Sequence, residues 1–377
     1  MSTFRKFTHR LFIISNIVAV TLFLLACANA FLHPGRWWFI SLLGLIFPLL
    51  FLIVLGFFTF GLFFPSCRRW SLVSLAALII GWPNIHCFWA FHPGKSFQSE
   101  KPPRTLRILT WNTRSFDEYI TKKRGASGHR PKMMDFIREQ DADVVCLQEF
   151  YNSRNPKDQD ANLIYIRDQL HYPYYYFSHD YVRHEALSEA GVIIFSRYPI
   201  TDSLIIHYPI DGLKTTESLI AADLRVGNDT VRIFTTHLQS VLFRTKDFHD
   251  IEIIKKVDDS ILQASRSIAK KLSYAFRRRG DQAEQVRAQL DKSPHPAIIC
   301  GDFNDVPNSY TYFTIRDGWQ DAFIAKGFGI GRTYVHISPT LRIDYILADP
   351  RLPVIQCRKF SLPYSDHNPV MANIQVP

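Results

Sequence analysis

The chain has 377 residues and a formal net charge of +10, but its charges are unevenly distributed. Only six of the 44 Lys and Arg residues precede residue 92, and that stretch contains no Asp or Glu. The remainder has 38 basic and 34 acidic residues, a surplus too small to indicate nucleic-acid binding from charge alone. Its three cysteines, Cys146, Cys300 and Cys357, lie in or near apolar runs without metal-ligand spacing, which argues against a disulfide framework or a cysteine metal site.

Three long apolar runs occupy the N-terminal stretch, at residues 11–32, 37–64 and 70–91. Each can cross a hydrocarbon core, which needs roughly 20 helical residues. We therefore expect three transmembrane helices within residues 1–91. They contain no Asp, Glu, Lys or Arg, so anchoring is a plainer role than transport. A cleaved signal peptide is the alternative for the first run, but such apolar regions have only about 7–15 residues.

Positive charges beside these runs predict the orientation of the chain. One basic cluster precedes the first run and another separates the second from the third; they are Arg5, Lys6, Arg10, Arg68 and Arg69. The positive-inside rule places both clusters in the cytoplasm, so three spans would leave residues from about 92 onward on the opposite side. A break at Trp82-Pro83-Asn84 that made the third helix re-enter would reverse this orientation.

Residues 92–105 contain prolines and mixed charges and are predicted to be a linker. Residues 106–377 are long enough for one large core. Strand-like runs recur there at 106–110, 144–147, 192–195, 219–224, 231–235, 297–300, 343–347 and 370–374. Helices are predicted at 131–139 and 161–170. Short strands interrupted by helices favour an α+β fold in which two sheets pack face to face with helices outside.

A helical insertion is predicted at about 240–296. Apolar residues recur there at spacings of three, four or seven; they are Ile251, Ile254, Ile261, Ile268, Leu272 and Phe276. This spacing is typical of an amphipathic helix, which we expect to cover a sheet. The basic run Arg277-Arg278-Arg279 at its end is either solvated or in contact with phosphate or anionic headgroups.

Short polar clusters follow the apolar runs. Glu149 ends a buried strand, where its carboxylate could help to hold a hard cation such as Mg²⁺, with Asn112 as a neutral neighbour. Asp302 and Asn304 follow the run 297–300, and alternation places both on one face with Phe303 on the other. Each alone is more often an Asx turn, a Gly-Asp turn or a surface acid. Their shared position at strand ends favours a site that aligns water and stabilises charge on phosphorus.

Two histidines, His237 and His367, also lie at strand ends. A lone histidine is more often structural. Asp344 is placed to accept the ring N–H of one of them, which would fix the tautomer and raise the basicity of the ring. Such a histidine is suited to act as a general base or to stabilise the developing phosphorane charge.

In this order the clusters resemble the endonuclease/exonuclease/phosphatase superfamily, over about residues 105 to 377. They are Asn112, Gln148-Glu149, His237, Gly301-Asp302-Phe303-Asn304, Asp344 and Ser365-Asp366-His367. The resemblance implies a four-layer αββα sandwich of two packed mixed sheets flanked by helices, with the site at one edge of both sheets.

The resemblance also implies roles for the matched positions. Glu149, with Asn112 and the second carboxylate Asp366, is similar to the family's metal site for Mg²⁺, with Mn²⁺ as an alternative. Asp302 resembles the residue that aligns the nucleophilic water, and Asn304 resembles its phosphate-binding companion. His367 with Asp344 resembles the His-Asp pair, and His237 resembles the histidine on the scissile phosphate. Glu189 is expected to orient His237.

These expectations together predict a membrane-anchored, metal-dependent phosphodiester hydrolase. The substrate class stays open between nucleic acid and a phospholipid or other phosphoester. The tether favours a membrane-proximal ester, and the modest charge argues against DNA. By resemblance to anchored members we expect a multi-pass protein of a bacterial inner membrane with an extracytoplasmic catalytic domain. The alternative is a noncatalytic membrane-anchored protein that binds a ligand or partner and retains the fold.

Overall fold

The computed structural model describes residues 3–93, 97–117, 128–158, 161–183, 187–208, 217–241 and 261–376. The chain divides into two compact units. The first, called here the helical unit, consists of Met1–Trp89, Ser240–Ala283 and Asp305–Ile315. The second, called here the two-sheet unit, consists of Ala90–Gln239, Glu284–Asn304 and Arg316–Pro377.

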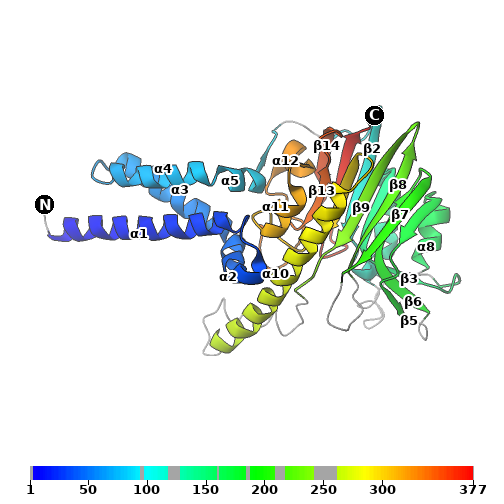
Figure 1. The fold of residues 1–377 in the computed structure, drawn as a ribbon, viewed down its shortest axis with the longest axis horizontal. Helices are drawn as coiled ribbons and strands as arrows, with labels where there is room; N and C mark the ends of the chain where they lie inside the picture. The colour runs from blue at the N-terminus through cyan, green and yellow to red at the C-terminus, as the bar shows by residue number, and fades with distance from the viewer. Residues whose placement is uncertain are drawn as a thin grey trace. The chain divides into compact units, whose positions relative to one another are not determined.

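The helical unit begins with five helices that follow the apolar runs of the sequence (Figure 1). They are α1 (Thr3–Ala28), α2 (Pro34–Leu45), α3 (Phe47–Phe63), α4 (Arg68–Ile80) and α5 (Trp82–Phe88). Helices α2 and α3 are bent by 60° at their junction, and α4 and α5 by 63°. Pro48 and Pro83 are the second residues of α3 and α5, where a missing N–H is tolerated at a helix start but would interrupt a continuous helix.

Among the residues that the structure describes, one helix is long and apolar enough to cross a membrane without interruption, over Lys6–Ala28. The pairs α2–α3 and α4–α5 meet the same criterion only if each bent pair is one span. The expectation of three transmembrane helices is therefore supported by a single helix only for the first run, because the second and third runs each form a bent pair of helices. Proline starts a new helix inside each of them, so length and hydropathy alone do not establish a multi-pass topology.

The two-sheet unit contains two mixed β-sheets. One has six strands in the order β11 (Gln320–Asp321), β13 (Asp344–Ala348), β10 (Ala297–Asp302), β9 (Asp229–His237), β8 (Ser218–Val226) and β7 (Ile200–His207). The other has seven strands, with the path β14 (Val354–Lys359), β15 (Val370–Gln375), β2 (Thr105–Asn112), β3 (Val144–Ser153), β6 (Ser188–Ser196) and β4 (Tyr174–Phe177), and β5 (Tyr181–Arg183) beside β6. A separate ribbon pairs β1 (Ala90–Phe91) with β12 (Phe328–Gly329).

The sheets pack face to face through inward-facing aliphatic side chains. Ile108 and Val144 of one sheet and Ile233 and Ile298 of the other belong to the same fully buried cluster. The outer face of the seven-stranded sheet is covered by α7 (Arg130–Gln140) and the turn α8 (Asn162–Ile164), which continues as η2 (Tyr165–Gln169). The prediction of two packed mixed sheets flanked by helices is confirmed. All eight predicted strands are present, and the strands at the sheet edges, including β7 and β14, were missed.

The predicted helical insertion is partly described, as α10 (Ile261–Asp291), whose Phe276 is buried. Ile251 and Ile254 lie outside the described residues. Arg279 does not form a free basic end, because it is buried and lies 3.2 Å from Asp305. The remaining short elements are η1 (Arg114–Asp117), α11 (Tyr310–Arg316) and α12 (Ala322–Lys326).

A buried ion pair next to β13 generates a prediction about stability. Arg342 and Asp321 approach to 2.6 Å, and each side chain is 1% exposed. Replacing Arg342 with Met would leave a buried carboxylate uncompensated, so we expect the free energy of unfolding of the full chain in detergent to fall by about 3–5 kcal/mol. Denaturant titration followed by circular dichroism measures this change.

The matched control is Arg351→Met. Arg351 and Asp349 approach to 2.5 Å, but the arginine side chain is 60% exposed. Because the arginine end of this pair is solvated, the pair contributes less than a buried one, and the control should lose less stability than Arg342→Met. Equal losses of unfolding free energy in both variants would contradict the conclusion that the buried pair of Arg342 and Asp321 stabilises the fold.

Candidate active site

The site is built where the two central parallel strand pairs end. β2 pairs with β3 in parallel, and β9 pairs with β10 in parallel. In the second pair Asp302 lies opposite His237, and on its other side Asp302 lies opposite Asp344 of the antiparallel β13. Because strands in register end at the same edge, these polar side chains are brought together although they are far apart in the sequence.

A β-bulge in β3 turns Glu149 toward this edge. The register of β3 and β6 shifts between Leu147 and Phe150, and Glu149 has a positive φ of 48°. Leu147 and Phe150 both face the outer cluster, so the two residues between them do not follow the ordinary alternation. Gln148 donates a 2.9 Å hydrogen bond to Thr235 Oγ1 of the opposite sheet, and Glu149 Oε1 accepts one of 3.1 Å from Asn112.

Gly301 allows β9 and β10 to approach closely just before Asp302. Its φ is +139°, and a Cβ atom at this position would lie 2.1 Å from the backbone oxygen of Thr236. Any side chain here would push the strands apart where they carry His237 and Asp302. The glycine of the Gly-Asp-Phe-Asn motif is therefore required by packing.

Asp302 is the centre of the site. Its side chain is fully buried, and its Oδ2 accepts a 3.0 Å hydrogen bond from Asn112 Nδ2. The same oxygen lies 3.7 Å from Nε2 of His237 and 3.7 Å from Nε2 of His367. Burial raises the pKa of the Asp302 carboxyl, and the two histidines oppose that shift.

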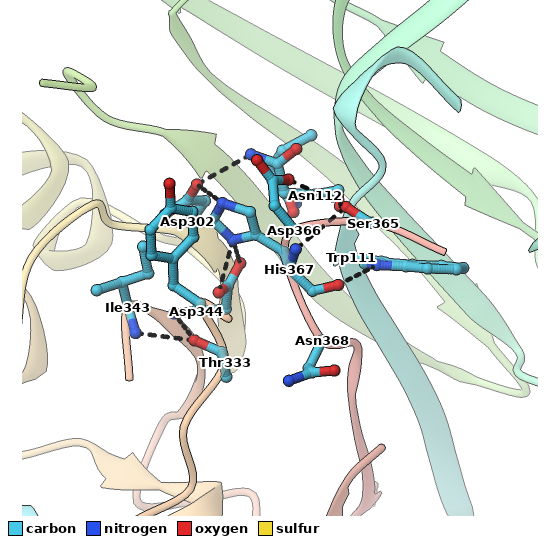
Figure 2. Close-up of polar contacts among 12 residues, drawn as sticks. Trp111, Asn112, Asp302, Thr333, Ile343, Asp344, Ser365, Asp366, His367 and Asn368 are labelled. Atoms are coloured by element: carbon cyan, nitrogen blue, oxygen red, sulfur yellow. Dashed lines mark hydrogen bonds and ion pairs between the residues drawn. The ribbon is translucent and has the colours of Figure 1, made fainter. Parts of the chain in front are cut away.

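His367 is held between two carboxylates (Figure 2). Its Nδ1 lies 3.0 Å from Oδ2 of Asp344, and its Nε2 faces Asp302. The backbone around it is also fixed, because Trp111 Nε1 donates to the His367 carbonyl at 2.8 Å and Ser365 Oγ donates to the Asn112 carbonyl at 2.9 Å. The loop before β15 is thereby bound to the end of β2.

These contacts keep His367 protonated at neutral pH. Burial of the ring disfavours its charge, but the carboxylates of Asp344 and Asp302 outweigh burial and raise the pKa of His367 to about 10. A charged imidazolium can donate a hydrogen bond to a phosphate oxygen, but it cannot accept a proton from water. This favours charge stabilisation over general base catalysis for this ring.

His237 has a different environment. Among the residues that the structure describes, neither of its ring nitrogens has a hydrogen-bond partner, although both are buried. The expected orientation by Glu189 is not found: Glu189 instead accepts a 2.8 Å hydrogen bond from Asn152 and lies 3.0 Å from His179. Glu189 lies on β6, whose side chains at this point bond within their own sheet. The ring instead faces two carboxylates, with Nε2 3.7 Å from Asp302 and 3.9 Å from Glu149.

Asn304 and Asp366 have partners that the sequence did not indicate. Asn304 has a positive φ of 53°, donates its backbone N–H to Asp302 Oδ1 and donates its side-chain amide to the Leu238 carbonyl at 3.0 Å. Asp366 lies 3.5 Å from Arg114. Asp366 and Glu149 both act on the nearby Tyr334, and both raise its pKa.

Two residues of the site were missed in the sequence. Arg114 follows Asn112 in a run of positive-φ residues, and Tyr334 forms a bridge with His367, with their ring centroids 5.0 Å apart. Burial raises the pKa of Tyr334, as do the nearby carboxylates of Asp366 and Asp302. Both residues lie outside the periodic segments, so no regular pattern signals them. The proximity of Arg114 to Asn112 was the one available signal.

The site can hold a divalent cation. Asp302, Asp344 and His367 offer ligand atoms within 4.8 Å of one another. In addition, Glu149 is 39% exposed and its carboxylate adjoins Asn112, which provides hard oxygen donors at the open side. The carboxylates of the site outnumber the cations Arg114 and His367, and a bound cation would offset this excess negative charge.

The comparisons with known proteins agree with this architecture. The sequence profile described as "Endonuclease/Exonuclease/phosphatase family" matches residues 109–367, so the chain belongs to this family. A second profile, described as a domain of unknown function (DUF8431), matches residues 9–88. An inositol phosphosphingolipids phospholipase C of Schizosaccharomyces pombe is 25% identical over 237 residues, which cover 59% of this chain. The chain spans about half, 48%, of the length of that relative.

Solved structures similar to this chain include two that the following alignments describe. An endonuclease/exonuclease/phosphatase from Beutenbergia cavernae aligns over 72% of each chain with 22% identity and a TM-score of 0.50. A sphingomyelinase C from Streptomyces griseocarneus aligns over 71% of this chain and 99% of its own with 19% identity and a TM-score of 0.45.

The raised pKa of His367 predicts a pH dependence of stability. A pKa that folding raises from 6.5 to about 10 stabilises the protein fully below pH 6.5, and this stabilisation is lost as the pH rises through about 10. In metal-free buffer we expect the free energy of unfolding to fall between about pH 7 and about pH 10, and to fall less steeply in His367→Gln.

Denaturant titration at each pH measures this difference. The exposed His171 provides the control, since His171→Gln should retain the slope of the wild-type chain. Indistinguishable slopes in the wild-type and His367→Gln proteins would show that the pair with Asp344 does not hold the proton.

Proposed function

We propose that this member of the family is a divalent-metal-dependent phosphodiester hydrolase that acts on phosphodiester lipids at a membrane surface. The observation that carries the hydrolase assignment is the position of Asp302, a buried carboxylate within 3.7 Å of two imidazoles and hydrogen-bonded to Asn112. A proton acceptor next to donors for a phosphate oxygen is what water attack on phosphorus requires.

In the proposed reaction Asp302 orients water and accepts its proton. Its raised pKa suits this role, because the carboxyl is a stronger base than an exposed aspartate. The protonated His367 and the unpaired His237 donate hydrogen bonds to the phosphoryl oxygens as negative charge develops there. Asp344 keeps the His367 ring in position and stabilises its charge. Asn304 holds the Asp302 carboxylate in position through its backbone N–H.

Glu149, with Asn112, is the proposed holder of the metal, because oxygen donors at the open side of the site suit Mg²⁺ or Mn²⁺ better than the buried Asp302–Asp344–His367 group. In that buried group the His367 nitrogen that faces Asp344 is already bonded. Asp366, which lies next to Arg114, adds to the negative charge that would attract the cation. When bound, the cation supplies Lewis-acid stabilisation of the phosphoryl charge.

The lipid substrate is supported by two observations. The Schizosaccharomyces pombe relative is named for hydrolysis of inositol phosphosphingolipids. In addition, the chain carries a helix that can cross a membrane, Lys6–Ala28, and it becomes multi-pass if α2–α3 and α4–α5 are each one span. We expect an anchor of this kind to keep the catalytic unit near the bilayer, and from the flanking positive charges we propose that this unit is extracytoplasmic.

A substrate panel tests this proposal. The full chain in detergent or liposomes is assayed against sphingomyelin, an inositol phosphosphingolipid, phosphatidylinositol, plasmid DNA, RNA and bis-p-nitrophenyl phosphate, each with Mg²⁺, Mn²⁺ or EDTA. We expect metal-dependent turnover of a phosphodiester lipid, and we expect Asp302→Asn to lower kcat by about 10²–10⁴-fold.

One control variant and two outcomes make the result decisive. His171→Gln should retain wild-type activity, because its side chain is exposed outside the site. Turnover of DNA or RNA without turnover of lipid would refute the substrate class. Folded protein without turnover on any member of the panel would favour the noncatalytic alternative.

The dependence of activity on metal concentration distinguishes the proposed role of Glu149 from that of Asp302. If Glu149 holds the cation, Glu149→Gln should weaken the apparent affinity for Mg²⁺ by about 10–100-fold or more, and excess Mg²⁺ should restore part of the activity. Asp302→Asn should keep its lowered kcat at every metal concentration, because it lacks the proton acceptor. Titrations of activity with Mg²⁺ measure both variants, and rescue of Asp302→Asn but not of Glu149→Gln would reverse the two roles.

A further inference from the structure

Directly after Asn304 the chain enters a buried segment of the helical unit, residues 305–309, every one of which is buried. Asn308 at its centre is 1% exposed. Its backbone oxygen accepts a 2.7 Å hydrogen bond from Asn29 Nδ2, its Oδ1 accepts one from Asn84 Nδ2, and its own Nδ2 donates to the Ala26 carbonyl at 2.9 Å. The segment is thus bonded to residues of the N-terminal helical region by both main chain and side chain.

The amide cluster is completed by further buried groups. Ser41 Oγ donates to Asn29 Oδ1 at 3.0 Å, and Cys87 Sγ donates to the Pro307 carbonyl at 3.0 Å. Asn29 is 1% exposed and Asn84 is 3% exposed. Buried amides that find partners for their polar atoms fix one arrangement, because any displacement would leave them unpaired away from water.

The opposite end of the segment is also tied within the helical unit. Asp305 Oδ2 accepts a 2.8 Å hydrogen bond from Thr311 and lies 3.2 Å from the buried Arg279 of α10. Asp305 is the next residue after Asn304, whose backbone N–H bonds Asp302 Oδ1. One peptide bond joins Asp305 to Asn304. A displacement of the segment 305–309 would therefore also displace Asn304, whose backbone N–H holds the Asp302 carboxylate.

We propose that Asn29 and Asn84 are positioning residues for hydrolysis: through Asn308 they hold the segment 305–309, and with it the conformation of Asn304 and Asp302. This inference rests on the proposed hydrolase function and extends it, since the N-terminal helices then contribute to catalysis as well as to anchoring. Asn304 has a positive φ of 53°, a conformation that needs support from its surroundings.

The chain provides a matched control in Asn16. It is also buried, it lies in α1, and it bonds Trp70 and Ser74 of α4 instead of the segment 305–309. Loss of Asn16 removes a comparable amide from the same helical region without touching Asn308. The variants to compare in the full chain are therefore Asn29→Ala, Asn84→Ala and Asn16→Ala.

Two readouts are needed. Hydrogen–deuterium exchange of peptides that cover residues 301–309 reports on the segment directly, and kcat and KM for bis-p-nitrophenyl phosphate report on catalysis. We expect Asn29→Ala and Asn84→Ala to accelerate exchange in this segment and to lower kcat by about 10- to 100-fold with little change in KM. The double variant should lose less than the product of the two single losses, because both act through Asn308. Asn16→Ala should lower thermal stability but leave exchange at 301–309 and kcat unchanged.

Equal effects of Asn16→Ala and Asn29→Ala would overturn the inference, since the loss would then reflect stability of the helices. Unchanged exchange at 301–309 in Asn29→Ala and Asn84→Ala would overturn it as well. If the wild-type protein hydrolyses no substrate, the proposed function fails, and the exchange experiment still decides whether the amide cluster holds the segment.

Discussion

The buried charge of Asp302 is the constraint on which the rest of the site depends. A fully buried carboxylate is unfavourable unless donors and positive charges surround it, and here Asn112, His237 and His367 occupy that position. Each of these groups comes from a different strand end. Asp344 then supports His367 from the far side. Removing Asp302 would leave two imidazoles and an amide around an empty position, so the residues of the site stabilise one another.

The backbone adopts unfavourable conformations to make this arrangement. Glu149 and Asn304 have positive φ values, as do the four residues of η1. Non-glycine residues in this region cost on the order of 1–3 kcal/mol each and persist where the surrounding structure enforces them. The β-bulge at Glu149 and the close approach at Gly301 have the same effect: both place polar groups at the sheet edge that regular strands would direct elsewhere.

Much of this could be predicted from the sequence because strand ends carry the chemistry. The apolar runs before Asn112, Glu149, His237 and Asp302 locate strands, and parallel pairing brings their ends together. The bulge that turns Glu149 could not be predicted, since it depends on how β3 pairs with β6. Glu189 was misassigned for the same reason: its position in β6 directs it to Asn152.

The N-terminal region shows more clearly that composition alone does not predict where helices begin and end. Its hydropathy predicted three spans, but Pro48 and Pro83 each begin a new helix, and the junctions bend by 60° and 63°. The polar residues Asn29, Asn84 and Asn308 have no periodic signal, and their mutual contacts depend on a return of the chain after β10. Contacts of this kind depend on the tertiary fold, so hydropathy alone does not predict them.

The central claim is that water bound at Asp302 attacks phosphorus. Hydrolysis of bis-p-nitrophenyl phosphate in ¹⁸O-labelled water by the full chain, followed by mass spectrometry of both products, tests it most directly. The account predicts one ¹⁸O atom in each p-nitrophenyl phosphate molecule and none in p-nitrophenol. Label in p-nitrophenol, with unlabelled p-nitrophenyl phosphate, would show attack at carbon and contradict it.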